Sequence, residues 1–257
     1  MAQNSHIIEK GAETSYIRPS TIFINAQKKA NEAFIANVAG NEKLAKIKKL
    51  LGKKKITIIK SQKKFFGLKN KYENPQKLGV DRLLAMLGLV DNKHLKKQIS
   101  ITKTNKFGTI IVSCGSAIAI DYWVIKTNKK ANQYSYNGGQ IIPGITLMAK
   151  SLKQGTANLP EIKFSSVLKY LKKKSYKHIF AQDTKTSIAL GILNSVSASI
   201  EKISEKTNNS RIPISTIYLT GGDATLLAKF INPKNIKTLV IDNLVLKGIH
   251  KIAQNKA

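Results

Sequence analysis

The chain has 257 residues, of which 42% are hydrophobic and 23% are charged, and these globular proportions exclude intrinsic disorder over most of its length. Lysine and arginine number 44 against 14 acidic residues, a formal net charge of +30, so the surface is expected to attract polyanions in a salt-dependent manner. No run of 18 apolar residues exists, and residues 1–6 lack a basic-then-apolar pattern, which excludes a membrane-spanning helix and argues against a secretory signal.

The first half of the chain is expected to alternate strands and helices. Three apolar or β-branched stretches are typical of strands: residues 21–25, 33–40 and 55–61. Asn41 is expected to cap a helix that ends at Leu51, because Gly52 follows it. A polar connection over residues 62–77 then leads to one amphipathic helix over residues 78–98, where leucines recur at helical spacing.

The second half begins with three strands and continues with alternating helices and strands. The predicted strands are residues 108–114, 117–125, a third toward Ile141, 217–220 and 238–241. The predicted helices are residues 143–154, 186–203, a short one after Gly222 and a last one from Leu244. The order β-β-β-α-α-β-α-β-α is the ribonuclease H-like pattern, and the first half is a shorter version of it. We therefore expect two related α/β domains, residues 1–106 and 107–257.

Glycine and polar residues are combined at four predicted strand or helix ends: residues 79–82 (GVDR), 113–116 (SCGS), 138–144 (GGQIIPG) and 220–223 (TGGD). A strand followed by glycine and a hydroxyl directs backbone N–H groups toward one point, which suits a phosphate group. Two glycines between a strand and a helix let a ligand approach the backbone at a helix N-terminus. Each segment alone is ordinary turn chemistry, but the four in this order favour a phosphate-binding site.

Three aspartates lie at positions where an acidic side chain has either a structural or a chemical role. Asp81 lies near the start of a predicted helix beside Arg82, so it is either an acid favoured by the helix dipole or a general base next to an anion-binding arginine. Asp121 lies within a predicted strand, where an acidic residue needs a specific partner. Asp223 follows two glycines, a position typical of a helix N-cap.

Histidine and cysteine give no sign of a metal site. The four histidines are spread along the chain, and none lies near a cysteine or another histidine at ligand spacing, so a structural zinc site is not expected. The single cysteine, Cys114, cannot form an internal disulfide, which is typical of a reducing cytoplasm.

The excess of positive charge allows two interpretations. Only three of the basic residues are arginine (Arg18, Arg82 and Arg211), whereas proteins that read nucleic acids usually use arginine to contact phosphates and guanines. Lysine is scattered along the whole chain beside many asparagines and isoleucines, which favours codon bias in an AT-rich genome. The alternative is a basic surface for nucleic acid or acidic lipid. In either case any nucleic-acid binding is expected to be non-specific.

Several motifs together resemble type III pantothenate kinases, in particular the Bvg accessory factor branch. The matching stretches are residues 66–72 (FGLKNKY), 78–82 (LGVDR), 112–121 (VSCGSAIAID), 138–148 (GGQIIPGITLM) with Leu152, 156–160 (TANLP), Thr184 with 191–193 (GIL), and 219–224 (LTGGDA). The resemblance extends over roughly residues 33–255. The combination of GGQIIPG, its Leu-Pro tail and GVDR is the most specific part.

The resemblance implies an α/β fold of two ribonuclease H-like domains, of the actin-like and sugar-kinase-like superfamily, with ATP in the cleft. The implied activity is the phosphorylation of pantothenate by ATP with Mg²⁺ and a monovalent cation, K⁺ or NH₄⁺, which is the first step of coenzyme A synthesis. A homodimer is also implied.

The resemblance also assigns roles to individual residues. Asp81 would be the base that accepts the proton of the attacking pantothenate hydroxyl, and Arg82 would lie near the pantothenate carboxylate. The implied substrate-binding residues are Tyr72, Gly79, Val80, Asp81, Arg82 and Thr184. The implied ATP-binding residues are Gly115, Ser116, Gly221 and Gly222, where Ser116 keeps the hydroxyl of a family threonine.

The phosphate loops depart from the family pattern in two places. Members begin with a strand that carries Asp-x-Gly-Asn-Thr/Ser, and residues 1–25 contain no such sequence, so the chain is expected to start about one strand and one loop short. The second loop of the family reads Asp-x-Gly-Thr-Ala-x-Thr. Here Ser113 replaces the aspartate that binds the monovalent cation, and Ala119 replaces the last threonine. The cations around ATP would therefore lose their main anionic ligands.

Three interpretations follow from this combination of motifs. The chain is a working pantothenate kinase with a shortened N-terminus, or a pseudokinase that keeps the fold and pantothenate binding. The third interpretation is a regulatory accessory factor or a basic nucleic-acid-binding protein on the same scaffold. Because the substrate motifs are kept and the phosphate loops are degenerate, we expect pantothenate binding with slow or absent turnover of ATP.

Overall fold

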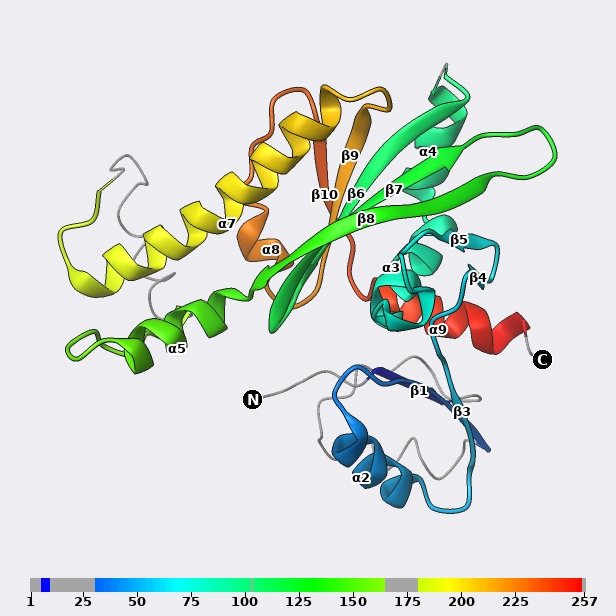
Figure 1. The fold of residues 1–257 in the computed structure, drawn as a ribbon, viewed down its shortest axis with the longest axis horizontal. Coiled ribbons are helices and arrows are strands. Elements are labelled where there is room, and N and C mark those ends of the chain that lie inside the picture. The colour runs from blue at the N-terminus through cyan, green and yellow to red at the C-terminus, as the bar shows by residue number, and fades with distance from the viewer. Residues whose placement is uncertain (1–5, 10–30, 103, 165–179, 256–257) are drawn as a thin grey trace. The chain divides into compact units, whose positions relative to one another are not determined.

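The computed structural model describes residues 6–9, 31–102, 104–164 and 180–255 (Figure 1). The strand predicted over residues 21–25 lies outside these residues. The chain divides into two compact units. Unit 1 comprises residues 1–107, 121–138 and 242–257, and unit 2 comprises residues 108–120 and 139–241. Each unit combines segments from different parts of the chain. The units therefore do not test the predicted division into domains 1–106 and 107–257, which stays a prediction.

A small three-stranded sheet belongs to unit 1. Strand β1 (His6–Glu9) pairs antiparallel with β2 (Glu32–Ala36), and β2 pairs parallel with β3 (Lys55–Ile58). Helix α2 (Asn41–Leu51) connects the two parallel strands and packs apolar side chains against β2. The strands expected at residues 33–40 and 55–61 are confirmed in shorter form.

The start of α2 corrects one expectation. Asn41 does not cap the helix, because it is already its first helical residue. The capping position belongs to Gly40, which has a φ of 88° and makes no side-chain hydrogen bond to the helix. A positive φ suits glycine, which has no Cβ to clash. The predicted end at Leu51 is confirmed, and Gly52 follows with a φ of 62°.

The segment expected to be a polar connection, residues 62–77, contains regular structure. It forms strands β4 (Lys64–Phe65) and β5 (Leu68–Asn70) and the short 3-10 helix η1 (Pro75–Lys77). Both residues of the hairpin turn, Phe66 and Gly67, have positive φ angles of 47° and 82°, as two-residue hairpins of type I′ require. The strands are two and three residues long, too short for an alternating pattern to reveal them.

The single helix predicted over residues 78–98 is in fact two helices. Helix α3 (Val80–Val90) is followed by its C-cap residue Asp91, and α4 (Lys93–Ile101) begins after Asn92. The side chain of Asn92 accepts a hydrogen bond of 2.9 Å from the backbone N–H of His94, and this capping interaction starts a new helix. Helical leucine spacing continues through the break, which is why the sequence pattern hides it.

Helix α3 packs closely against the last helix, α9 (Leu244–Asn255), within unit 1. A Cβ atom on Gly88 would lie 2.0 Å from the carbonyl oxygen of Leu244, and one on Gly248 would lie 2.2 Å from the carbonyl oxygen of Leu84. The two backbones can approach this closely only because each helix presents a glycine to the other. The predicted helix from Leu244 is confirmed, and it places the end of the chain against α3.

The larger sheet has the strand order β10-β9-β6-β7-β8-β5-β4. Its long strands are β6 (Lys106–Cys114), β7 (Ala117–Lys126), β8 (Gln133–Pro143) and β9 (Ile214–Thr220), and β10 is Lys237–Val240. Strand β9 pairs parallel with both β6 and β10. The helices of this part are α5 (Ile145–Gly155), α7 (Thr184–Asn208) and α8 (Ala224–Leu227). The predicted order of strands and helices from β6 to α9 is confirmed.

Helix α7 of unit 2 begins at a side-chain cap. Asp183 caps α7 by accepting a hydrogen bond of 2.9 Å from the N–H of Thr186, and α7 then contacts α5, α8 and β9. Strands β6 and β9 are almost entirely buried, as expected for parallel strands in an α/β protein. Among the described helices, none combines the length and the apolar character that a membrane crossing requires.

Candidate active site

The first turn of helix α3 carries the predicted base. The backbone N–H of Arg82 is shared between the carbonyl oxygen of Gly79, at 3.1 Å, and Oδ1 of Asp81, at 3.0 Å. Asp81 is partly exposed, and Gly79 precedes the helix. A Cβ atom on Gly79 would lie 2.6 Å from Asp81 Oδ1. The carboxylate of Asp81 therefore occupies the space that a side chain at position 79 would need.

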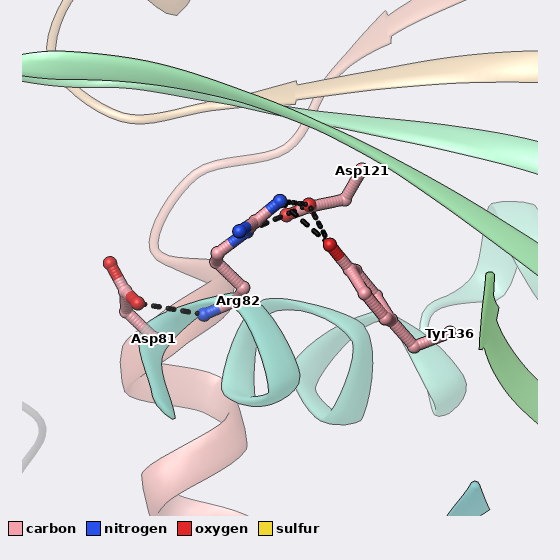
Figure 2. Close-up of polar contacts among 4 residues, drawn as sticks. All are labelled: Asp81, Arg82, Asp121 and Tyr136. Atoms are coloured by element: carbon pink, nitrogen blue, oxygen red, sulfur yellow. Dashed lines mark hydrogen bonds and ion pairs between the residues drawn. The ribbon is translucent and has the colours of Figure 1, made fainter. Parts of the chain in front are cut away.

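Arg82 is largely buried and forms an ion pair with Asp121 (Figure 2). Its Nε donates a hydrogen bond of 2.8 Å to Asp121 Oδ1, and its Nη2 donates to the same oxygen. Nη2 also donates to the hydroxyl of Tyr136 at 2.7 Å, and that hydroxyl lies 3.3 Å from Asp121 Oδ1. Asp121 is 0% exposed, so the acid within strand β7 has the specific partner that its burial demands.

Burial and charge shape the titration of this cluster. Burial raises the pKa of the Asp121 carboxyl, while the hydrogen bonds and positive charge of Arg82 partly offset that rise. Burial alone would lower the pKa of Arg82, but the hydrogen bond and the charge of Asp121 outweigh it and raise that pKa. Burial and the neighbouring Asp121 charge raise the pKa of Tyr136. The tyrosine hydroxyl is therefore protonated at neutral pH and can donate to Asp121.

The loop that carries Tyr72 is held by a buried asparagine. Asn70 Oδ1 accepts a hydrogen bond of 3.0 Å from the N–H of Tyr72, and its Nδ2 donates to the carbonyl oxygen of Pro75 at 3.0 Å. Tyr72 is 39% exposed, and its ring centroid lies 6.1 Å from that of Tyr136. Tyr136 therefore contacts both Arg82 and Tyr72, two of the predicted substrate-binding residues.

In unit 2, the predicted nucleotide loops meet at the carboxyl ends of two parallel strands. Ser113 on β6 pairs in register with Thr220 on β9. Gly221 has a φ of 101°, and a Cβ atom on it would lie 2.3 Å from the carbonyl oxygen of Cys114. In open α/β sheets, ligands bind outside the carboxyl ends of the strands. The loops around Gly115 and Gly221 are thus brought together where a nucleotide would be expected.

A second glycine contact closes the turn between β6 and β7. The N–H of Gly144 donates a hydrogen bond of 3.0 Å to the carbonyl oxygen of Ser116. A Cβ atom on Gly144 would lie 2.2 Å from the carbonyl oxygen of Gly115. The GGQIIPG segment therefore packs its last glycine directly on the predicted phosphate loop.

The residues near the phosphate loop offer only a limited set of ligands for cations. The Oγ atom of Ser113 is buried and has no hydrogen-bond partner among the described residues, and a hydroxyl of this kind can serve as a neutral ligand for a monovalent cation. The described residues contain no group of three or more acidic, histidine or cysteine side chains that could hold a metal ion together. Mg²⁺ is commonly held by one or two carboxylates with the substrate phosphates, so a complete protein cage is not needed.

Asp223 is the acidic residue of the glycine loop at residues 220–223. It occupies the N-cap position of α8, as expected, but its side chain makes no capping hydrogen bond. Its backbone N–H lies 3.4 Å from the carbonyl oxygen of Cys114. Burial raises the pKa of Asp223. Burial, together with the charge of Asp223, raises the pKa of Cys114 to about 12. Asp223 therefore places a carboxyl group near the Cys114 thiol.

The predicted site residues fall into two groups. Tyr72, Gly79, Val80, Asp81 and Arg82 lie in unit 1, and the loop residues 113–116, 221 and 222 lie in unit 2. Thr184 is the first residue of α7, also in unit 2. Sequence reasoning missed Tyr136 in β8 and Asn70 in β5, because a tyrosine or an asparagine within a strand gives no local signal of a partner far away in the sequence.

Comparisons with known proteins agree with the arrangement of these motifs. A family model of type III pantothenate kinases matches residues 7–206. A type III pantothenate kinase of Janthinobacterium sp. (strain Marseille) is 29% identical over 227 residues, which cover 85% of this chain and 76% of that protein. One from Herminiimonas arsenicoxydans is 32% identical over 192 residues, covering 73% of this chain and 62% of that protein.

Among solved structures, an Alp12 filament matches 62% of this chain and 50% of that chain with 14% identity and a TM-score of 0.36, which is too low to establish a shared fold. The family match is the decisive comparison, since it spans most of the chain and includes the segments 79–82, 113–116 and 138–144. It confirms the family expected from the motifs and, with it, the α/β fold class. The chain belongs to the type III pantothenate kinase family.

Proposed function

We propose that this protein transfers the γ-phosphoryl group of ATP to the hydroxyl of pantothenate, which yields 4′-phosphopantothenate and ADP. The observation that carries the proposal is the first turn of α3, where the Asp81 carboxylate fills the space left by Gly79 beside the buried Arg82. Family membership supports the reaction class.

In the proposed mechanism, Asp81 accepts the proton of the pantothenate hydroxyl as its oxygen bonds to the γ-phosphorus of ATP. The bond from that phosphorus to the bridging oxygen breaks, and ADP leaves. Arg82 and Tyr72 would hold the substrate, with Gly79 and Val80 supplying backbone contact. Gly115, Ser116, Gly221 and Gly222 would contact ATP through backbone N–H groups and a hydroxyl. Because phosphoryl transfer depends mainly on positioning and charge neutralisation, these contacts are its main requirement.

Cations would supply the charge neutralisation that the loops provide only in part. Ser113 Oγ would be a neutral ligand for K⁺ or NH₄⁺, and Asp223 is the carboxylate nearest in sequence to the Gly221–Gly222 loop. Mg²⁺ bound with ATP would neutralise the phosphate oxygens. Removal of one well-placed electrostatic group typically lowers the rate by about 10²–10³-fold, so a slow enzyme is expected.

The experiment is a steady-state assay with pantothenate, ATP, Mg²⁺ and K⁺ or NH₄⁺, accompanied by calorimetric titration of pantothenate. We expect saturable pantothenate binding and a turnover well below the ~1–100 s⁻¹ that is ordinary for kinases. Binding without any turnover would make the chain an inactive homologue. No pantothenate binding would overturn the proposal.

We also propose that the protein is a homodimer, as the family resemblance suggests. We propose a cytoplasmic location, as the single cysteine suggests. Light scattering at micromolar concentration tests the oligomeric state, and a mass of one chain throughout would contradict the dimer.

A further inference from the structure

We propose that Asp121 and Tyr136 are positioning residues that aim the Arg82 guanidinium at the carboxylate of the substrate. The inference rests on the proposed function, which supplies a substrate with a carboxylate. Asp121 and Tyr136 would set the orientation of the Arg82 guanidinium without contacting the reacting atoms themselves.

The hydrogen bonds of Arg82 fix the guanidinium and leave one nitrogen unused. Nε and Nη2 both donate to Asp121 Oδ1, and Nη2 also donates to Tyr136. Nη1 makes no hydrogen bond to any residue that the structure describes. A guanidinium is planar with five N–H donors in a rigid fork, so fixing two nitrogens fixes the third. The two N–H groups of Nη1 are then free to donate to a ligand.

Among the described residues, Asp121 is hydrogen-bonded through its side chain only to Arg82 and Tyr136. Its Oδ1 accepts from Arg82 and Tyr136, whereas its Oδ2 is buried and has no hydrogen-bond partner in the described part of the chain. Buried polar atoms are nearly always paired, and each exception needs an explanation. Burial of Asp121 leaves Oδ2 without a hydrogen bond among the described residues, which is energetically unfavourable. The side-chain hydrogen bonds of Asp121 are made to Arg82 and Tyr136. Both facts fit a role in holding Arg82.

Tyr136 extends the same support to the loop of Tyr72. The Arg82 guanidinium lies 5.4 Å from the Tyr136 ring centroid, and Trp123 packs edge-on against the same ring at 5.3 Å. The ring centroid of Tyr72 lies 6.1 Å from that of Tyr136. Because the Tyr136 side chain is fully buried, its ring and hydroxyl hold both predicted substrate residues in place. Figure 2 shows Arg82 between Asp81 on one side and the Asp121–Tyr136 pair on the other.

Two substitutions test position without changing charge. Asp121→Glu keeps the ion pair but adds one methylene, which displaces the guanidinium. Tyr136→Phe keeps the ring and removes the hydroxyl that contacts Nη2. The matched control is Tyr218→Phe, because Tyr218 is also a fully buried tyrosine but lies in β9 of unit 2, whereas Arg82 belongs to unit 1. Circular dichroism and thermal unfolding establish that each variant is folded.

The readout is the calorimetric affinity for two ligands, pantothenate and pantothenyl alcohol, in which CH₂OH replaces the carboxylate. We expect both site variants to bind pantothenate about tenfold more weakly, because a hydrogen bond to a charged group is lost or misplaced. Their affinity for pantothenyl alcohol should change less than about twofold. The Tyr218→Phe variant should keep the preference of the unaltered protein for pantothenate.

The possible outcomes separate the inference from the proposed function. An unaltered protein that binds no pantothenate would overturn the proposed function and the inference with it. Folded variants that keep the original preference, or that lose both ligands equally, would overturn only the inference. If Asp121→Glu does not fold, Tyr136→Phe decides the question alone, because it only removes an oxygen.

Discussion

Gly79 and Asp81 compete for the same space at the start of α3. A Cβ atom at position 79 would lie 2.6 Å from Asp81 Oδ1, and the atom that must give way is the end of a flexible side chain. A larger residue at position 79 should therefore move the carboxylate and leave the helix intact.

We predict that Gly79→Ala lowers turnover about 10–100-fold, since a displacement of about 1 Å in an active site can have that effect. The melting temperature should change little. Gly191→Ala is the control, because Gly191 is exposed and a Cβ there would meet no atom within 4 Å. A Gly79→Ala enzyme with full turnover would show that the position of Asp81 is not set by this contact.

Asp81→Asn tests the base itself. Asparagine keeps the size of the side chain but cannot accept the proton of the substrate hydroxyl. We predict a loss of turnover of about 10²–10⁴-fold, measured as the rate of ADP formation. Pantothenate affinity should stay within about threefold of the original value. A variant that retains most of its turnover would remove Asp81 from the mechanism.

Cys114 is expected to be chemically inert in the folded protein. It is 1% exposed, and burial together with the charge of Asp223 raises its pKa to about 12. Only about 10⁻⁴ of the thiol is then ionised at pH 8, and the thiolate is the reactive form. We predict no reaction with a chromogenic disulfide reagent at pH 8 until urea unfolds the chain. Stoichiometric labelling of the native protein within minutes would contradict this.

At the scale of elements, the contact between α3 and α9 depends on one glycine from each helix. The atom that a new Cβ would meet is a backbone carbonyl oxygen in both cases, at 2.0 Å for Gly88 and 2.2 Å for Gly248. A backbone atom cannot rotate away as a side chain can, so the helices themselves would have to separate.

We predict that Gly88→Ala and Gly248→Ala each lower the free energy of unfolding by about 1–3 kcal/mol, the usual cost of overpacking. In a helix without such a contact, replacing glycine by alanine should stabilise the protein. Gly191→Ala in α7 should therefore raise the free energy of unfolding by about 0.5–1 kcal/mol. Urea denaturation measures all three variants. Stabilisation by Gly88→Ala would mean that the helices are farther apart than described.

At the scale of the whole molecule, the net charge of +30 is the dominant property. The acidic residues number 14 against 44 basic ones, so most lysines have no acidic partner available. Charge of this kind attracts any polyanion through release of counterions, without reading its sequence.

We predict that the protein binds heparin and random duplex DNA at low salt, and that the affinity falls steeply and linearly on a logarithmic salt scale. Fluorescence titrations at 50 and 200 mM salt measure the slope. Selection of a particular DNA sequence at physiological salt would favour the interpretation as a nucleic-acid-binding protein.

The sequence by itself predicted the elements whose signal is local and long. The strands and helices from β6 to α9 follow from apolar runs, glycine turns and caps, and the glycine loops with GVDR indicated the family. It predicted less well where elements are short or where a periodic pattern continues through a break. The hairpin at residues 64–70 and the division of α3 from α4 depend on the turn at Phe66–Gly67 and the cap at Asn92.

Only the tertiary structure decided which partners these residues have. The sequence places Arg82 beside Asp81, but 39 positions separate Arg82 from Asp121 and 54 separate it from Tyr136. The contact of Gly88 with Leu244 likewise joins distant parts of the chain. Local patterns reflect backbone conformation and burial, whereas an ion pair or a close helix contact arises from the way the strands and helices pack. The sequence therefore determined the family and most elements, and packing determined that Arg82 is a buried, oriented group.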